Sequence, residues 1–342
     1  MHRRVEFFPG DRILVSRTDK LGDLILALPF VESLKLRYPE CRIEVVASLY
    51  ASPVLEQNPK IDGIVRVQND QLRADNLYRK DLLRRLRSAN YRAVVALFPE
   101  SQICRLFYAA GIPHRFGTAG RFHSIYFNHR LLHSRKANRK HESEYNQDFL
   151  KYFRSGQTVT MPKVHLVDKE LTHARRILSE IGVDGRFAVV HPGSGGSAEV
   201  WPVKRYLELA RRLEGTGLPV LLTGSDPERQ SIDELSRTAD IAVRNLAGKT
   251  DLRTLAALLS LASVVVSNST GPLHLAVAVG TRVVGVYPSR VVMSPVRWGP
   301  LGDGHRVIQP RTSNCTCPSH HCRCMESITI EKVAMEVLAV SG

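Results

Sequence analysis

A short polar segment near the N-terminus contains the residues best suited to acid–base chemistry. Residues 17–23 read Arg-Thr-Asp-Lys-Leu-Gly-Asp and follow an apolar run at residues 13–15. A carboxylate at the end of a buried strand lies where α/β sheets bind ligands, and it can take a proton from an attacking hydroxyl group. Asp23 is therefore a candidate general base, with Asp19 as the alternative base and helix capping as the alternative role of Asp23. Two cations of the segment could attract an anionic acceptor: Arg17 and Lys20.

A second segment, residues 266–274, has the composition of a phosphate-binding turn. It reads Val-Ser-Asn-Ser-Thr-Gly-Pro-Leu-His and lies between an apolar run and an apolar helical stretch. A Ser or Thr before a proline marks the start of a helix, where free N–H groups and the helix dipole favour a phosphate. Ser269 and Thr270 are therefore candidate phosphate ligands, with an ordinary helix cap as the alternative. His274, one turn into the helix, either supports the phosphate or packs in the core.

Two more strand ends carry small or acidic residues. Residues 189–196 read Val-Val-His-Pro-Gly-Ser-Gly-Gly, and these glycines allow the backbone to approach a ligand closely. Residues 222–226 read Leu-Thr-Gly-Ser-Asp at another strand end. Asp226 or Glu228 could bind the hydroxyl groups of a ribose, and the alternative for both is helix capping. Trp201, which is followed by a proline at the start of the next helix, is expected to pack in the core.

These segments depend on strands and helices that alternate along the chain, which predicts parallel sheets with right-handed crossovers. Strands are expected at residues 13–16, 42–47, 64–67, 92–98, 187–191, 219–223, 264–267 and 282–287. Helices are expected at residues 22–38, 81–87, 144–153, 168–181, 203–213, 228–238, 252–261, 272–279 and 330–340. Pro29 is expected to kink or divide the first helix. Residues 112–141, with five histidines and little helical periodicity, are expected to form a polar surface connection and acceptor loop without a metal site.

The length and composition fit a protein of two folded domains. The chain has 342 residues, of which 43% are hydrophobic, so it can bury two cores. No apolar run reaches the roughly 18 residues that span a bilayer. Residues 1–10 are too poor in apolar residues for a signal peptide. A cytoplasmic location is therefore expected.

The positive charge is concentrated in one part of the chain. The net charge is +15, and residues 71–140 contain 15 basic and 3 acidic residues. Such a stretch favours an anionic partner, either a phosphorylated substrate or an anionic membrane surface, and a solvated basic surface is the alternative. The stretch lacks the stacking aromatic residues and the modules of nucleic-acid-binding proteins. Nucleic acid is therefore not an expected partner.

Read in chain order, the motifs R-x-D-x-L-G-D, H-P-G-S-G…W-P and S-T-G-P-x-H resemble those of the lipopolysaccharide heptosyltransferase family (glycosyltransferase family 9). The resemblance extends over residues 12–337. It implies the α/β fold called GT-B, two doubly wound Rossmann-like domains facing an interdomain cleft. The implied domains are an N-terminal acceptor-binding domain at 1–160 and a C-terminal nucleotide-sugar-binding domain at 161–325. The C-terminal helix, 326–342, is expected to pack back on the N-terminal domain.

The same resemblance implies an inverting glycosyltransferase that moves a heptose-like sugar from ADP-heptose to the lipopolysaccharide core or a related glycan. Asp23 is then the catalytic base, no cofactor is required for catalysis, and the basic first domain faces the anionic inner membrane from its cytoplasmic side. The implied donor-binding residues line the diphosphate and sugar: Gly193, Ser194, Gly195, Ser269, Thr270, Gly271 and His274. The alternatives are a nucleotide-sugar epimerase of the same fold and a non-catalytic nucleotide- or polyanion-binding protein.

Two departures from the family pattern leave the donor open. Many members carry Lys or Arg directly before the Trp-Pro pair, where this chain has Glu199 and Val200. Lys204 is therefore the candidate cation for the diphosphate. Members also often carry Asp-Ser-Gly or Asp-Thr-Gly where this chain has Ser-Thr-Gly at residues 269–271. ADP-heptose remains the expected donor, with another nucleotide sugar as the alternative.

Four of the six cysteines lie close together near the C-terminus. Two Cys-x-Cys pairs separated by four residues could hold a structural Zn²⁺ through thiolates. A disulfide, which the cytosol disfavours, and free thiols are the alternatives. The residues concerned are Cys315, Cys317, Cys322 and Cys324.

Overall fold

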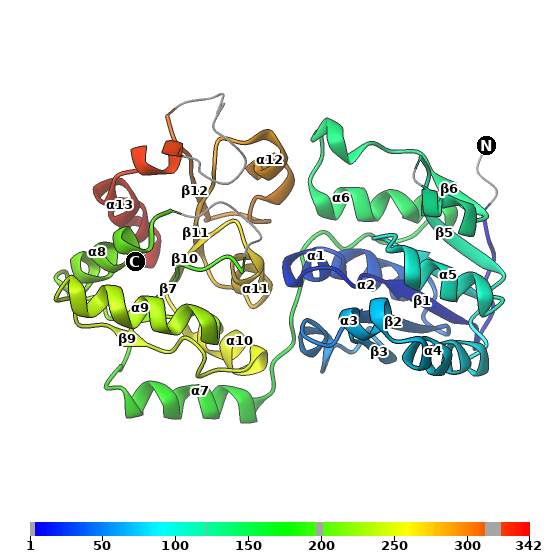
Figure 1. The fold of residues 1–342 in the computed structure, drawn as a ribbon, viewed down its shortest axis with the longest axis horizontal. Helices are drawn as coiled ribbons and strands as arrows, with labels where there is room; N and C mark the ends of the chain where they lie inside the picture. The colour runs from blue at the N-terminus through cyan, green and yellow to red at the C-terminus, as the bar shows by residue number, and fades with distance from the viewer. Residues whose placement is uncertain (1–3, 121, 196–200, 312–322) are drawn as a thin grey trace. The chain divides into compact units, whose positions relative to one another are not determined.

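The computed structural model describes residues 4–120, 122–195, 201–311 and 323–342. It divides into two compact units, Met1–Pro162 and Lys163–Gly342. Each unit is a parallel sheet with helices packed on it (Figure 1). The division falls close to the domain boundary that we expected between residues 160 and 161.

The first unit contains a parallel sheet with the order β3-β2-β1-β4-β5-β6. Strand β1 is central and pairs with both β2 and β4, so its side chains are buried on both faces of the sheet. This burial explains its continuous apolar sequence. The strands are β1 (Arg12–Ser16), β2 (Arg42–Ser48), β3 (Gly63–Val67), β4 (Ala93–Ala96), β5 (His114–Thr118) and β6 (His129–Leu131).

The helices of the first unit cover the sheet. The α-helices are α1 (Leu21–Ile25), α2 (Leu28–Arg37), α3 (Asn69–Ala74), α4 (Asn76–Ser88), α5 (Ser101–Ala109) and α6 (Glu142–Gln147). The 3₁₀ helices are η1 (Ser52–Leu55), η2 (Phe122–Tyr126), η3 (Arg135–Ala137) and η4 (Asp148–Tyr152). The expected helix at 22–38 is divided into α1 and α2, because Pro29 fits only the first turn of the second helix.

Residues 112–141 are more regular than we expected. They contain two strands, β5 and β6, and the short helices η2 and η3. The sequence interpretation missed these strands because most of their residues are polar. Only a few of their side chains are apolar and buried, such as those of Phe116 and Leu131. His129 stacks on the Phe116 ring with centroids 4.3 Å apart, so part of the histidine content is structural.

The second unit contains a parallel sheet with the order β12-β11-β10-β7-β8-β9. Its strands are β7 (Ala188–His191), β8 (Val220–Leu222), β9 (Arg244–Asn245), β10 (Val264–Asn268), β11 (Val283–Val286) and β12 (Arg306–Ile308). Its α-helices are α7 (Asp168–Glu180), α8 (Val203–Glu214), α9 (Asp226–Thr238), α10 (Leu252–Leu261), α11 (Gly271–Ala278), α12 (Pro295–Trp298) and α13 (Ile330–Ser341). Two 3₁₀ helices complete the unit: η5 (Val291–Met293) and η6 (Arg323–Ser327).

The C-terminal helix belongs to the second unit. There α13 packs on α8, β10 and β11 (Figure 1); its expected packing on the first unit stays a prediction. Its buried face contains Val333, Val337 and Val340, which join the same apolar cluster as Trp201. The spacing of these valines forms one helical stripe, and the second unit supplies the apolar surface that covers it.

Both sheets are parallel and flanked by helices, which confirms the α/β fold class and the two doubly wound units that we expected. In such sheets, ligands bind beyond the carboxyl ends of the strands. Within the described part of the chain, no helix combines the length and the apolar character needed to cross a bilayer.

Candidate active site

The first group of candidate residues lies at the carboxyl edge of the first sheet. β1 ends at Ser16, and the backbone N–H of Arg17 still donates to the carbonyl of Val46 on β2. The chain then turns, and α1 begins after Lys20 with Asp23 in its first turn. The turn therefore brings three functional groups together: Arg17, Asp19 and Asp23.

The guanidinium group of Arg17 is the centre of a buried ionic network. Its side chain is 2% exposed. Nε donates to Asp19 Oδ1 at 2.8 Å, and the Nη2 group donates to Asp23 Oδ1. Burial by itself lowers the pKa of Arg17, but the surrounding carboxylates outweigh burial and raise it. Arg17 is therefore a permanent cation whose donors are directed at protein acceptors.

This arrangement changes the role of Arg17. We expected Arg17 to attract an anionic acceptor, but a buried guanidinium that is already paired with carboxylates is poorly placed to do so. Arg17 instead donates to the carboxylate of the candidate base. Lys20 is exposed at the N-cap of α1, and it stays a prediction as an acceptor contact.

Helix α6 completes the network from a distant part of the chain. The Nη1 group of Arg17 lies 3.0 Å from Glu142 Oε1 and 3.0 Å from Asn146 Oδ1. Glu142 is completely buried, and its Oε1 also lies 3.1 Å from Nε of Arg135. The Nδ2 group of Asn146 donates to the carbonyl of Leu26 at 3.1 Å, which fixes the orientation of its amide.

The sequence interpretation missed these residues of α6. Glu142 and Asn146 are separated by four positions, so they lie on one face of the helix. Tyr145 and Phe149, which are buried, mark the same segment as a core-facing helix. Two polar residues at this spacing, in a segment that is otherwise buried, were the signal that could have indicated a partner for a buried cation.

The environment of Asp23 is that of a proton acceptor near neutral pH. Its side chain is 15% exposed. The pKa of Asp23 is raised to about 7, mainly by burial; Arg17 opposes this rise, and the negative charges of Asp19 and Glu142 add to it. A base is most effective when its pKa lies near the working pH. The structure is therefore consistent with Asp23 as a base.

The second group of candidates lies at the carboxyl edge of the second sheet, where Asn268 ends β10. Asn268 is completely buried. Its Oδ1 accepts hydrogen bonds from the backbone N–H of Trp201 at 3.0 Å and from the Tyr206 hydroxyl at 2.8 Å. Its Nδ2 donates to the carbonyl of Pro192 at 2.7 Å. Asn268, which we did not single out from the sequence, therefore ties β10 to the segments after β7 and before α8.

The turn after Asn268 has the expected form. Thr270 is the N-cap of α11, and a proline occupies the first turn. The Thr270 hydroxyl lies 3.1 Å from the Ser267 hydroxyl. Ser269 and Gly271 are half-buried at this helix start. His274 is only 3% exposed, which favours packing over contact with a phosphate.

The glycine-rich turn after β7 is shaped by an acidic neighbour. A Cβ atom on Gly193 would overlap the carboxylate of Glu228. The backbone N–H of Gly195, a residue with φ of +51°, lies 3.4 Å from Glu228 Oε1. Glu228 Oε2 accepts from the N–H and the hydroxyl of Ser225 at 2.7 and 2.8 Å. Glu228 therefore both caps α9 and supports this turn, and Ser194 lies half-buried between the two glycines.

The other residues of these segments occupy different environments. His191 is buried, which lowers its pKa to about 4, and its Nδ1 lies 3.0 Å from the Thr223 hydroxyl. His191 is therefore neutral at physiological pH. Asp226 and Lys204 are both exposed in the first turns of α9 and α8. Trp201 is completely buried, which confirms packing as its role.

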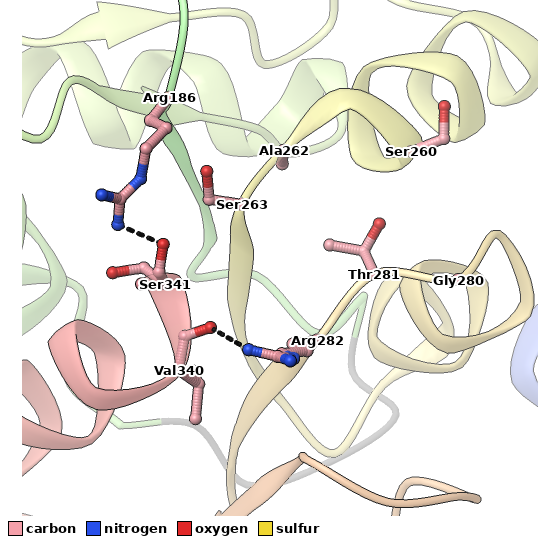
Figure 2. Close-up of a pocket in the computed structure, with 10 residues that line it drawn as sticks. Arg186, Ser260, Ala262, Ser263, Gly280, Thr281, Arg282, Val340 and Ser341 are labelled. Atoms are coloured by element: carbon pink, nitrogen blue, oxygen red, sulfur yellow. Dashed lines mark hydrogen bonds between the residues drawn. The ribbon is translucent and has the colours of Figure 1, made fainter.

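A cavity in the second unit lies away from these residues (Figure 2). Its volume is about 460 Å³, and it borders the residues that precede β7, β10 and β11, at the edge opposite to the candidate site. Arg186 donates to the carbonyl of Ser341, and Arg282 donates to that of Val340 at 3.2 Å (Figure 2). These arginines satisfy the last turn of α13, so the cavity is part of the helix packing.

Three of the clustered cysteines, together with Glu199 and Val200, lie outside the described residues: Cys315, Cys317 and Cys322. Cys324 is half-buried in η6. Among the described residues, no group of three or more His, Cys, Asp or Glu side chains could hold a metal ion. A structural zinc at the cysteines therefore stays a prediction.

The two doubly wound units, each with candidate residues at the carboxyl edge of its sheet, define the GT-B class. A family model described as glycosyltransferase family 9 (heptosyltransferase) matches residues 79–327. The chain belongs to glycosyltransferase family 9 and is a glycosyltransferase.

Similar proteins support this assignment. The chain is 29% identical over 308 residues to a putative glycosyltransferase of Haemophilus influenzae, covering 87% of this chain and 88% of the relative. It is 25% identical over 309 residues to lipopolysaccharide heptosyltransferase 2 of Escherichia coli, covering 87% and 88%. Among solved structures, the glycosyl transferase family 9 protein of Veillonella parvula has a TM-score of 0.83 at 19% identity, covering 98% of both chains. The E. coli ADP-heptose LPS heptosyltransferase II has a TM-score of 0.79 at 23% identity, covering 97% and 98%.

Proposed function

We propose that this protein transfers a heptose-like sugar from ADP-heptose to the lipopolysaccharide core or a related glycan. The relatives named as lipopolysaccharide heptosyltransferases extend over most of the chain, and one similar structure is named for ADP-heptose. The observation that carries the proposal is Asp23, a half-buried carboxylate at the carboxyl edge of the first sheet with a pKa that burial raises to about 7.

The proposed reaction is a single displacement with inversion. The acceptor oxygen forms a bond to the anomeric carbon of the donor sugar while the bond from that carbon to the diphosphate oxygen breaks. The electron pair of the broken bond goes to the diphosphate, and Asp23 takes the proton of the acceptor hydroxyl group. Because attack and departure occur on opposite faces of the carbon, the configuration is inverted. Asp19, held by the same guanidinium at 2.8 Å, is the alternative base.

The donor diphosphate is proposed to bind at the carboxyl edge of the second sheet. The backbone N–H groups of residues 193–195 are proposed to contact a phosphate, beside the Glu228 carboxylate, which occupies the space where a Cβ atom of Gly193 would lie. Thr270, Gly271 and the N–H groups at the start of α11 stabilise the departing charge. Further contacts of the donor are proposed to come from Ser194, Lys204, Asp226 and Ser269.

A ribose contact is better assigned to Asp226 than to Glu228. Glu228 already accepts hydrogen bonds from Ser225 and lies near the Gly195 N–H. Burial opposes ionisation of Glu228, but these hydrogen bonds outweigh burial and lower its pKa. Asp226, two residues earlier, is exposed and can reach a ligand. No metal or other cofactor is part of this proposal.

The first unit is proposed to contact the cytoplasmic face of the inner membrane. α4 packs against α5, and α5 packs against η2, so the three form one continuous layer. Exposed basic residues occupy this layer: Lys80, Arg84, Arg85, Arg87 and Arg105. Exposed apolar side chains lie in the same layer: Leu77, Tyr108, Phe122 and Ile125. Basic and apolar groups together suit an anionic lipid surface.

Vesicle binding tests the membrane contact. The double variant Lys80→Glu with Arg85→Glu is expected to weaken binding to anionic vesicles at least tenfold at low salt, and added salt is expected to weaken the wild type. The control is Arg175→Glu with Arg211→Glu, which makes the same charge change on exposed helices of the second unit. Equal binding by the two double variants would contradict this surface.

Nucleotide binding tests the proposed donor. Thermal unfolding is measured with ADP, UDP, GDP and CMP at the same concentration. A ligand at 100 times its Kd stabilises the native protein by about 2.7 kcal/mol, which corresponds to a rise in Tm of roughly 5–10 °C. A selective response to ADP is the expected result. A selective response to UDP or GDP would replace the donor, and no response to any of them would contradict the proposed donor site.

A further inference from the structure

A buried glutamate on α6 shares the cation that holds the proposed base. Oε1 of Glu142 accepts a hydrogen bond from Arg17 at 3.0 Å and forms an ion pair with Nε of Arg135 at 3.1 Å. We propose that Glu142, opposed by Arg135, is a positioning residue that controls how strongly Arg17 interacts with Asp23, and so sets the pH at which the base becomes active. This inference rests on the proposed function of Asp23.

The geometry of Arg17 leaves the guanidinium group little freedom. A guanidinium group is planar, and its five donors point in fixed directions. Its Nη1 group is held by two acceptors of α6, so the direction of its Nη2 group toward Asp23 is fixed by that helix. Asn146 cannot turn its amide without losing its hydrogen bond to the carbonyl of Leu26. These α6 residues therefore fix the direction from which Arg17 donates to Asp23.

The charges of the cluster explain why α6 also affects protonation. The charged groups that face Asp23 are Arg17 and Asp19 from the turn after β1 and Glu142 from α6, with Arg135 of η3 behind Glu142. When all are ionised, three carboxylates face two guanidinium groups, so the cluster carries a net charge of −1. Lys20 is exposed beside it. A cluster with excess negative charge in a buried site binds a proton more readily than a neutral one.

The two partners have opposite effects on the base. Neutralising Glu142 removes a negative charge that competes for Arg17, so Asp23 should ionise at lower pH. Neutralising Arg135 leaves the charge of Glu142 less compensated, so Arg17 is drawn toward Glu142 and Asp23 should ionise at higher pH. A purely structural contact would not shift the pKa of Asp23 in opposite directions when its two partners are replaced one at a time.

The experiment is the pH dependence of kcat/KM for sugar transfer, whose acidic limb reports the pKa of the base in the free enzyme. Glu142→Gln is expected to shift this limb to lower pH by about one unit or more, and Arg135→Gln is expected to shift it to higher pH. If Glu142→Gln folds poorly, Asn146→Asp, which adds a carboxylate facing Arg17, is expected to shift the limb to higher pH.

A matched control is available in the same unit. Glu44 is also buried, and it forms an ion pair with Arg12 at 2.6 Å. Because Arg12 is the first residue of β1, this pair lies at the opposite end of the strand from the carboxyl edge. Glu44→Gln is expected to leave the limb unchanged. Loss of activity in the Glu142 and Arg135 variants without a shift, or a shift in the same direction for both, would overturn the inference.

The failure of this inference differs from the failure of the proposed function. If Asp23→Asn keeps full turnover, Asp23 is not the base and the proposed function loses its catalytic residue. If Asp23→Asn is inactive while the acidic limb keeps its position in both Glu142→Gln and Arg135→Gln, only the positioning role of Glu142 is contradicted.

Discussion

Replacing Asp23 with asparagine is expected to remove activity and, at high pH, to stabilise the protein. Burial is the main reason that the pKa of Asp23 rises from its ordinary value of 3.8 to about 7. Because the pKa in the folded state lies above that in the unfolded state, the stability contribution of this group is full below about pH 4 and is lost as the pH rises through 7. Asparagine keeps the Oδ1 acceptor for Arg17 but never ionises.

The magnitude follows from the difference between the two pKa values. Relative to low pH, where Asp23 is protonated in both the folded and the unfolded state, the wild type is expected to lose about 2 kcal/mol of unfolding free energy at pH 5 and about 4 kcal/mol at pH 8. Asp23→Asn avoids this loss, so its gain over the wild type should be about twice as large at pH 8. At roughly 2–4 °C per kcal/mol, the rise in Tm at pH 8 is on the order of 10 °C.

The assay is differential scanning fluorimetry of both proteins at pH 5 and pH 8, together with sugar transfer at pH 8. Transfer should fall by roughly 10²- to 10⁴-fold because the general base is gone. A stabilisation that is equal at the two pH values, or a variant that is less stable than the wild type at pH 8, would refute the argument that the folded protein disfavours the ionised form of Asp23.

Three further substitutions test the supports of the two sites. Gly193→Ala should displace the carboxylate of Glu228, weaken ADP binding at least tenfold in calorimetry and lower the stability by roughly 1–3 kcal/mol. Asn268→Ala should lose roughly 2–4 kcal/mol in denaturant unfolding, because buried groups lose three hydrogen bonds. Arg17→Lys, which cannot reproduce the planar donors, should reduce kcat at least tenfold while ADP affinity is unchanged. An active Arg17→Lys enzyme would show that the network is not needed.

The sequence was most informative where a motif coincides with a strand end. The segments that begin at Arg17, Pro192 and Ser269 each follow a buried strand, so periodicity and composition agree. The helix start at Thr270 has the expected form, whereas the close contact of Gly193 is with a protein side chain. Gly193 approaches the carboxylate of Glu228, and Thr270 is the N-cap of its helix.

The sequence could not show which distant residues meet at the site. Arg17 and Glu142 are 125 positions apart, and most of the first unit lies between them, so their pairing depends on how α6 packs against α2. A buried cation must have partners, but composition alone does not name them. For a related reason, the sequence could not show which elements pack on the C-terminal helix, because the apolar stripe of α13 does not specify its partners.

The most direct test of the central claim is a mass measurement of the acceptor after incubation with ADP-heptose. The acceptor is a lipopolysaccharide core that lacks its outer heptose, and the wild type and Asp23→Asn are assayed side by side at pH 8 after calorimetry has shown that both bind ADP equally. We predict that the acceptor gains the mass of one heptose with the wild type and gains none with the variant. Equal transfer by the two proteins would contradict the assignment of Asp23, and no transfer by the wild type would contradict the proposed substrates.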